Sequence, residues 1–195
     1  GILIVGACIT IFALATAQRL SCKRLEFRDP RLTRKYRLVQ ISDVHIGSRS
    51  VGFLRYVVEV INTQNPDLIV ITGDFLDAKR VQANDIAPLK NLKAPVYFSI
   101  GNHERYAGLD WVVPMLEDAG VVVLRSQAVK VGELQLIGID DAEDEDQVRR
   151  ELSTIELDPE CFKILLYHRP LGWESAVASG INLMLSGHTH NGQIF

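Results

Sequence analysis

Two stretches of the chain, LVQISDVH at residues 38–45 and LIVITGD at residues 68–74, share one pattern. In each, a short run of aliphatic and β-branched residues leads directly into polar residues. Such runs are typical of buried strands. The pattern therefore predicts strands that deliver polar side chains to the end of a sheet, and it recurs three more times along the chain.

The rest of the chain alternates between strand and helix patterns. Apolar runs predict strands at residues 38–41, 68–71, 96–100, 121–124, 129–131, 134–139, 164–167 and 183–185. Helical periodicity lies between them, at residues 52–65, 84–92, 109–119, 145–153 and 172–179. This alternation predicts a layered α/β domain with sheet buried on both faces. Gly132-Glu133 joins two of the strands as an antiparallel hairpin, so we expect a mixed sheet.

Composition narrows the class of protein. A length of 195 residues predicts one domain with at most an appendage, and 47% apolar residues exclude wholesale disorder. The net charge of −3 provides no bulk attraction for nucleic acid, so no nucleic-acid partner is expected. Three scattered cysteines, Cys8, Cys22 and Cys161, form no disulfide framework or zinc knuckle.

The two ends of the chain carry separate expectations. Residues 1–18 have no charge and predict a clipped transmembrane helix, with a buried core helix as the alternative. Residues 19–36 form a basic connector, and its positive charges favour a membrane-associated protein with the catalytic part in the cytoplasm. Residues 37–195 form the main domain, and residues 192–195 look like the start of a strand, so we expect the domain to continue beyond them.

All five histidines of the chain follow directly after predicted strands. They share these positions with carboxylates and one amide, and glycines at residues 73, 101 and 187 allow close backbone approach there. Ligands gather at the carboxyl ends of strands in open α/β sheets, so we expect these groups to converge. The candidate site consists of Asp43, His45, Asp74, Asn102, His103, Glu104, His168, His188 and His190.

These residue types predict a metal site. Imidazole nitrogens and carboxylate and amide oxygens suit Zn, Mn or Fe, and the absence of cysteine argues against a structural zinc site. Seven or eight ligands are too many for one ion, whereas two ions about 3.5–4 Å apart would use them. Strand alternation is expected to send both outer residues of Asp43-Val44-His45, and of His188-Thr189-His190, toward one ion.

The motif order D-x-H, G-D, G-N-H-[DE], H and G-H-x-H resembles the calcineurin-like metallophosphoesterase family. The uncharged segment 1–18 and the sequence GHTHNGQ at residues 187–193 are similar to the membrane-associated subgroup of that family. The resemblance implies a four-layer α/β/β/α sandwich of two mixed sheets, preceded by a transmembrane helix, with a dinuclear site at one edge.

Carried over residue by residue, the resemblance implies a role for each member of the site. Asp43, His45 and His190 would hold the first metal, Asp74 would bridge both, and Asn102, His168 and His188 would complete the second. His103 would protonate the leaving oxygen or stabilise the charge that develops on the phosphate, and Asp43 or Asp74 would orient its ring. Glu104 is expected behind the ligands. Arg169 would contact substrate phosphate or form a structural ion pair.

The expected function is hydrolysis of a phosphate ester, with a phosphodiester favoured, by a hydroxide bridging two divalent ions. The predicted membrane segment makes a lipid or envelope phosphodiester an attractive substrate. The alternative is a non-catalytic metal-binding interaction scaffold, although a scaffold would be expected to have lost ligands and none is missing. Tyr106 and Trp111 either border the substrate cleft or pack within a helix, and the acidic run at residues 140–146 predicts a solvated loop and helix cap.

Overall fold

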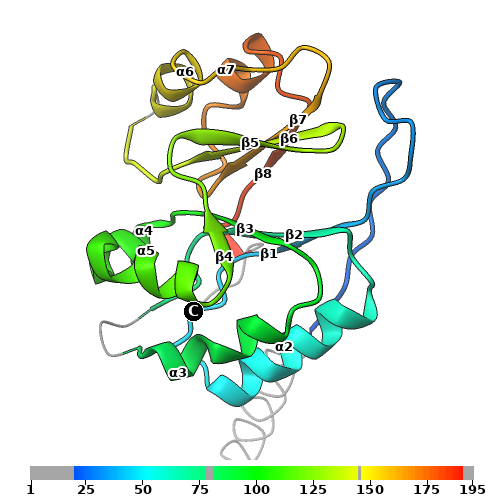
Figure 1. Ribbon diagram of the computed structural model, residues 1–195. Coiled ribbons are helices and arrows are strands. Elements are labelled where there is room, and N and C mark those ends of the chain that lie inside the picture. The colour runs from blue at the N-terminus through cyan, green and yellow to red at the C-terminus, as the bar shows by residue number, and fades with distance from the viewer. Residues whose placement is uncertain (1–19, 78–80, 145, 191–195) are drawn as a thin grey trace, which may run out of the picture.

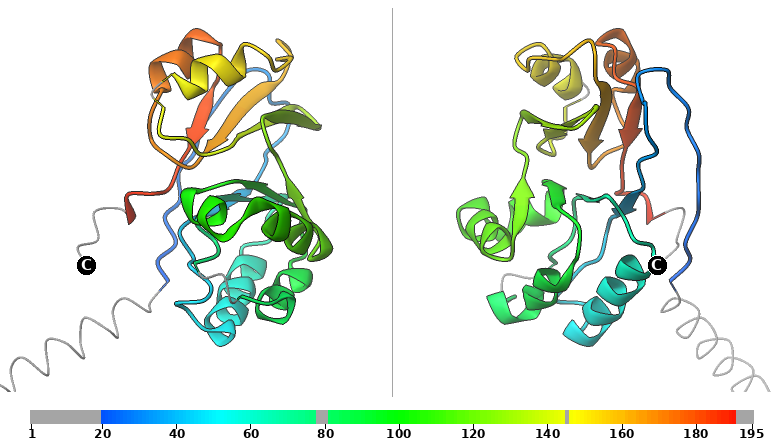
Figure 2. Two further views of the ribbon diagram at one scale, coloured as in Figure 1. Left: turned by 90° about the vertical axis from the view of Figure 1, so that its left-hand side faces the viewer. Right: turned by 45° about the vertical axis from the view of Figure 1, so that its right-hand side comes forward.

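The computed structural model describes residues 20–77, 81–144 and 146–190. Within these residues the chain forms two four-stranded sheets that pack face to face (Figure 1). Helices cover the outer face of each sheet, which gives the four layers expected for an α/β/β/α sandwich (Figure 2).

The first sheet has the order β1-β2-β3-β4 and is parallel throughout. Its strands are β1 (Leu38–Ile41), β2 (Leu68–Thr72), β3 (Val96–Ser99) and β4 (Val121–Val123). The expectation of two mixed sheets is therefore wrong for this one. A helical segment crosses over between each pair of consecutive strands, and a crossover returns the chain in the same direction.

The second sheet has the order β5-β6-β7-β8 and is mixed, as expected. Its strands are β5 (Gln127–Val131), β6 (Leu134–Ile139), β7 (Phe162–Tyr167) and β8 (Leu183–Leu185). The two-residue turn at Gly132-Glu133 makes β5 and β6 antiparallel, while β6, β7 and β8 run parallel.

Three apolar clusters hold the layers together. One lies between the first sheet and its helices, α2 (Val51–Thr63), α3 (Ala83–Ile86), the 3-10 helix η1 (Ala87–Asn91) and α5 (Leu109–Asp118). A second lies between the two sheets, and a third packs α6 (Gln147–Leu152) and α7 (Trp173–Ala178) on the second sheet. Each fully buried aliphatic side chain contributes about 1.5–3 kcal/mol of hydrophobic free energy.

Helix α4 (Asn102–Ala107) begins inside the third polar cluster and was not predicted. Its sequence, NHERYA, has no apolar stripe from which helical periodicity could be recognised. Glu104 at its third position accepts the backbone N–H of Gly101 at 2.9 Å, which satisfies one of the donors at the start of the helix. The helix places Asn102 and His103 at the carboxyl end of β3.

The chain ahead of β1 packs against the second sheet. Leu32 and Tyr36 contact the cluster between the sheets, and the Tyr36 hydroxyl accepts the backbone N–H of Glu133 at 3.0 Å. This part of the predicted basic connector is thus fastened to the sandwich. The boundary between connector and main domain at residue 37 stays a prediction.

The predicted transmembrane segment at residues 1–18 lies outside the described residues. Among the residues that the structure describes, no helix is long and apolar enough to cross a bilayer. Helix α2, with 13 residues, is about 20 Å long, whereas a hydrocarbon core is about 30 Å thick. The described residues therefore give no support to the predicted membrane-associated location with its cytoplasmic catalytic domain.

Candidate metal centre

The carboxyl ends of β1, β2, β3, β7 and β8 meet at one edge of the sandwich, and all the predicted site residues lie there. The backbone N–H of Asp43 donates to the carbonyl of Gly73 at 3.2 Å, which joins the ends of β1 and β2. The backbone N–H of His188 donates to the Asp43 carboxylate at 3.0 Å, which joins the two sheets. Convergence of the five clusters therefore results from packing of both sheets.

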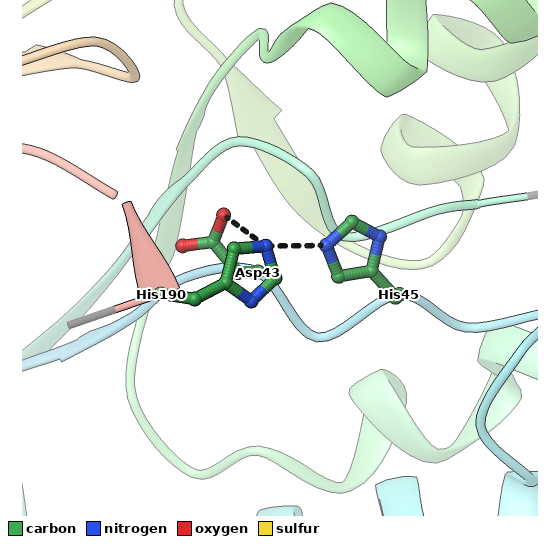
Figure 3. Close-up of side chains that lie close together, drawn as sticks. All are labelled: Asp43, His45 and His190. Carbon is green, nitrogen blue, oxygen red and sulfur yellow. Dashed lines mark hydrogen bonds and ion pairs between the residues drawn. The ribbon is translucent and has the colours of Figure 1, made fainter. Parts of the chain in front are cut away.

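Asp43, His45 and His190 form one group of potential ligands (Figure 3). The Nε2 atoms of His45 and His190 are 3.3 Å apart, and His190 Nε2 lies 3.6 Å from an Asp43 carboxylate oxygen. The two imidazole rings are stacked with an interplanar angle of 12°. Residues 145 positions apart in the chain thus aim their donor atoms at one point.

Asp74, His168 and His188 form a second group, and the Asn102 side chain adjoins it. The Nε2 atom of the fully buried His168 lies 3.1 Å from Asp74 Oδ2, 3.1 Å from Asn102 Oδ1 and 3.2 Å from His188 Nδ1. His168 Nδ1 faces the Thr72 carbonyl at 2.8 Å, so we assign the proton of the neutral ring to Nδ1. Four potential ligand atoms then face one another at distances that fit binding to one metal ion.

Both groups have the dimensions of a metal site. Ligand atoms about 2.0–2.2 Å from one ion lie about 2.8–3.6 Å from each other in octahedral or tetrahedral arrangements. The donor–donor distances above span 3.1–3.6 Å. Nitrogen and oxygen donors of this kind fit Mn, Fe or Zn and do not select among them.

In the second group, the pKa values of His168 and Asp74 are shifted in opposite directions. Burial favours the neutral forms of both His168 and Asp74, yet their mutual hydrogen bond and charge attraction dominate. The pKa of His168 is therefore raised and that of Asp74 is lowered.

The backbone at the site is unusual. Five of the predicted ligand residues have positive φ values between 48° and 71°, namely Asp43, His45, Asp74, His188 and His190. Non-glycine residues seldom adopt this left-handed conformation, which costs roughly 1–3 kcal/mol and is typical of functional sites. Gly73 between β2 and Asp74 also has a positive φ, and a Cβ there would lie 2.7 Å from His168 Nδ1.

These dihedral angles correct the expectation that strand alternation aims the ligand pairs. Asp43 and His45 converge through left-handed turns, because they lie beyond the end of β1. His188 and His190 do not face one point: His188 adjoins His168, whereas His190 adjoins His45. The two histidines of the G-H-x-H motif thus belong to different groups.

His103 forms a third group of potential ligands with His45 and with Asp77, a residue that the sequence analysis missed. His103 Nδ1 lies 2.7 Å from Asp77 Oδ1, while His103 Nε2 is 3.9 Å from Asp74 Oδ2. Asp77 is therefore the nearest partner of the His103 ring, while Asp74, one of the two expected partners, accepts the His103 backbone N–H at 2.9 Å. Asp77 could have been suspected from the sequence, because it follows Asp74 by only three residues. The short loop beyond β2 brings Asp77 back toward the site.

Asp77 also interacts with a predicted ligand. Its Oδ1 atom lies 3.5 Å from His45 Nδ1, and the Ser48 hydroxyl donates to its other oxygen. Burial opposes ionisation of Asp77, but the Ser48 hydrogen bond and the neighbouring imidazoles hold its pKa below the usual value. Asp77 is therefore ionised and can fix the protonated nitrogen of both His45 and His103.

Glu104 is fully buried behind the ligands. Its carboxylate accepts four backbone N–H groups at 2.8–2.9 Å, from Asp74, Phe75, Leu76 and Gly101. Burial raises its pKa, and these hydrogen bonds oppose that effect. Glu104 thereby joins the chain after β2 to the chain after β3, and no potential ligand group of the described residues includes it.

Arg169 forms ion pairs with Asp141 and Glu143. Its Nε atom lies 2.7 Å from a carboxylate oxygen of Asp141, and both side chains are largely buried. The acidic run at residues 140–146 is accordingly not a wholly solvated loop: Asp140 and Asp141 are buried, and Arg125 pairs with Asp140 at 2.8 Å. Of the two uses expected for Arg169, the structure shows the ion pair.

The fold and this arrangement of histidines and carboxylates belong to one known class of protein. Residues 36–192 match the family of calcineurin-like phosphoesterases, and the chain belongs to this family, as its motifs predicted. It is 31% identical over 182 residues to an uncharacterized metallophosphoesterase of Campylobacter jejuni, covering 89% of this chain and 49% of the relative. It is 32% identical over 169 residues to an uncharacterized metallophosphoesterase of Aquifex aeolicus, covering 82% and 64%.

A relative from Bos taurus is named as a transmembrane protein with a metallophosphoesterase domain. This chain is 33% identical to it over 184 residues, which is 82% of this chain and 41% of that protein. The term transmembrane in that name refers to the relative and not to this chain. The chain spans about half the length of the first curated relatives that it matches.

Proposed function

We propose that this chain hydrolyses a phosphate ester, preferably a phosphodiester, with the help of two divalent ions. Family membership and the two groups of donor atoms support this proposal. The observation that carries it is the cluster of four potential ligand atoms around His168 Nε2, because their spacing fits the binding of one cation. The proposed catalytic unit is the domain from residue 37 onward.

In this proposal, Asp43, His45 and His190 hold one ion, and Asn102, His168 and His188 hold the other. Asp74, from the loop between the two groups, serves both. When bound, the two ions lower the pKa of water and polarise the phosphoryl oxygens. The left-handed backbone at five of these residues aims their side chains before substrate arrives.

His103 is the proposed proton donor to the leaving oxygen. Asp77 at Nδ1 fixes the ring, so Nε2 faces the ligand groups and holds the transferable proton. Asp77 keeps the ring in this orientation, and the partly exposed His103 can reach a bound ester. Arg169 has no part in this proposal, since Asp141 holds its guanidinium group.

The test is hydrolysis of bis-4-nitrophenyl phosphate and 4-nitrophenyl phosphate by purified protein with Mn²⁺, Fe²⁺ or Zn²⁺, paired with metal analysis. We expect about two ions per chain, faster turnover of the diester, and loss of activity with a chelator. A protein that holds two ions and cleaves no phosphoester would instead support a metal-binding scaffold. The expectation of a lipid or envelope phosphodiester rested on the predicted membrane segment at residues 1–18. The described residues do not support it, so it is not part of this proposal.

A further inference from the structure

Tyr106 is a large aromatic residue next to the proposed proton donor. It lies on α4, three residues and therefore about one turn after His103, and 64% of its surface is exposed. The two ring centroids are 6.0 Å apart, with an interplanar angle of 59°. Tyr106 therefore leaves an open aromatic face beside the His103 ring.

Asp77 determines which nitrogen of the His103 ring is left to face a substrate. Asp77 occupies Nδ1 of His103, so the proton for a leaving group comes from Nε2. In an in-line displacement the leaving oxygen departs on the side opposite the attacking water, so its substituent extends past the proton donor. A substituent that passes the His103 ring comes within reach of Tyr106, whose ring centroid lies 6.0 Å from that of His103.

We propose that Tyr106 determines specificity for the leaving group and favours phosphoesters whose leaving group carries an aromatic ring, such as an aryl group or a nucleobase. Offset or tilted contact between two aromatic rings is favourable, and an aliphatic group gains less from the same surface. This inference rests on the proposed function. Tyr106 is assigned no part in metal binding or in proton transfer.

The test compares two esters whose leaving alcohols have similar acidity, phenyl and hexafluoroisopropyl. We expect Tyr106→Leu to lower kcat/KM for the phenyl ester about 3- to 10-fold while the fluoroalkyl ester changes less than about 2-fold. Tyr106→Phe keeps the ring and should retain the preference. The control is Tyr56→Leu, which removes another exposed tyrosine, from α2, and should leave both rates unchanged.

A binding measurement gives a second readout. Phenylphosphonate should bind the metal-loaded wild type more tightly than methylphosphonate, and Tyr106→Leu should remove that difference in titration calorimetry. An unchanged ratio between the two esters, or an equal loss on both, would refute the inference and leave the proposed function intact. A wild-type protein that cleaves neither ester would refute the proposed function and, with it, the inference.

Discussion

Asp77 Oδ1 lies 2.7 Å from His103 Nδ1 and 3.5 Å from His45 Nδ1, so one carboxylate oxygen serves two imidazole rings of different proposed roles. One ring is the proposed proton donor and the other a proposed metal ligand.

Asp77→Asn removes the carboxylate that orients the His103 ring. We expect kcat to fall about 10- to 100-fold at saturating Mn²⁺, and metal affinity to fall about 10-fold. Steady-state kinetics and metal titration measure the two effects. Asp146→Asn, at an exposed site, is the control, and full activity of Asp77→Asn would contradict the dyad.

His103 itself should separate catalysis from metal binding. The His103→Ala variant loses the proton donor, so we expect kcat to fall about 10²- to 10⁴-fold. Metal content should stay at the wild-type value, because His103 is held by Asp77 and its Nε2 is 3.9 Å from the nearest Asp74 oxygen. Elemental analysis of the same sample provides the check. Loss of metal from this variant would make His103 a ligand and disprove its proposed role.

Asp74 should behave in the opposite way. It is almost fully buried, and its Oδ2 atom lies 3.1 Å from His168 Nε2. Asp74→Asn removes the negative charge between the two ligand groups, so metal and activity should be lost together. Metal analysis and an activity assay at increasing Mn²⁺ measure both. Asp118→Asn, at an exposed position on α5, should change neither. A fully active Asp74→Asn that retains both ions would show that Asp74 does not bridge them.

Replacing Glu104 should lower the stability of the fold, because its carboxylate accepts four backbone N–H groups. Glu104→Gln places an amide NH₂ against backbone N–H groups that now donate to a carboxylate oxygen. Each buried donor left unsatisfied costs about 1–3 kcal/mol, so we expect the free energy of unfolding to fall by at least about 2 kcal/mol. Urea unfolding of the metal-free protein measures this. Glu117→Gln, exposed on α5, is the control. An unchanged midpoint would mean that the four hydrogen bonds contribute little.

Metal binding should depend on pH through His168. Burial opposes protonation, but the hydrogen bond and charge of Asp74 raise the pKa of this ring above its ordinary 6.5. An ion needs the unprotonated Nε2, so metal affinity should weaken as pH falls through that raised pKa, starting above 6.5. Burial lowers the pKa of His45 and of His188, so these rings do not compete in the same range. Calorimetric titration of Mn²⁺ in two buffers of different ionisation enthalpy should detect release of a proton. Affinity that is constant across this range would contradict the shift.

Several elements of the fold could be predicted because their cause is local. The apolar runs at residues 38–41 and 68–71 lie within β1 and β2, since a buried strand needs such residues whatever surrounds it. The apolar stripe of α2 could also be predicted from the sequence, and Leu54, Val57 and Ile61 are buried against the first sheet. By contrast, α4 has no such stripe and forms around the buried Glu104. The parallel first sheet depends on how crossovers pack, which no single segment shows.

By itself, the sequence determined the alternation of strand and helix, the family, and the polar residues gathered after five strands, because these follow from residue type and spacing. Only the tertiary structure decided which residues meet. His190 faces His45 and His188 faces His168, because the two sheets pack against each other and left-handed turns aim the side chains. The pairing of Asp77 with His103 has the same origin: the distance between two side chains far apart in the chain is a property of packing.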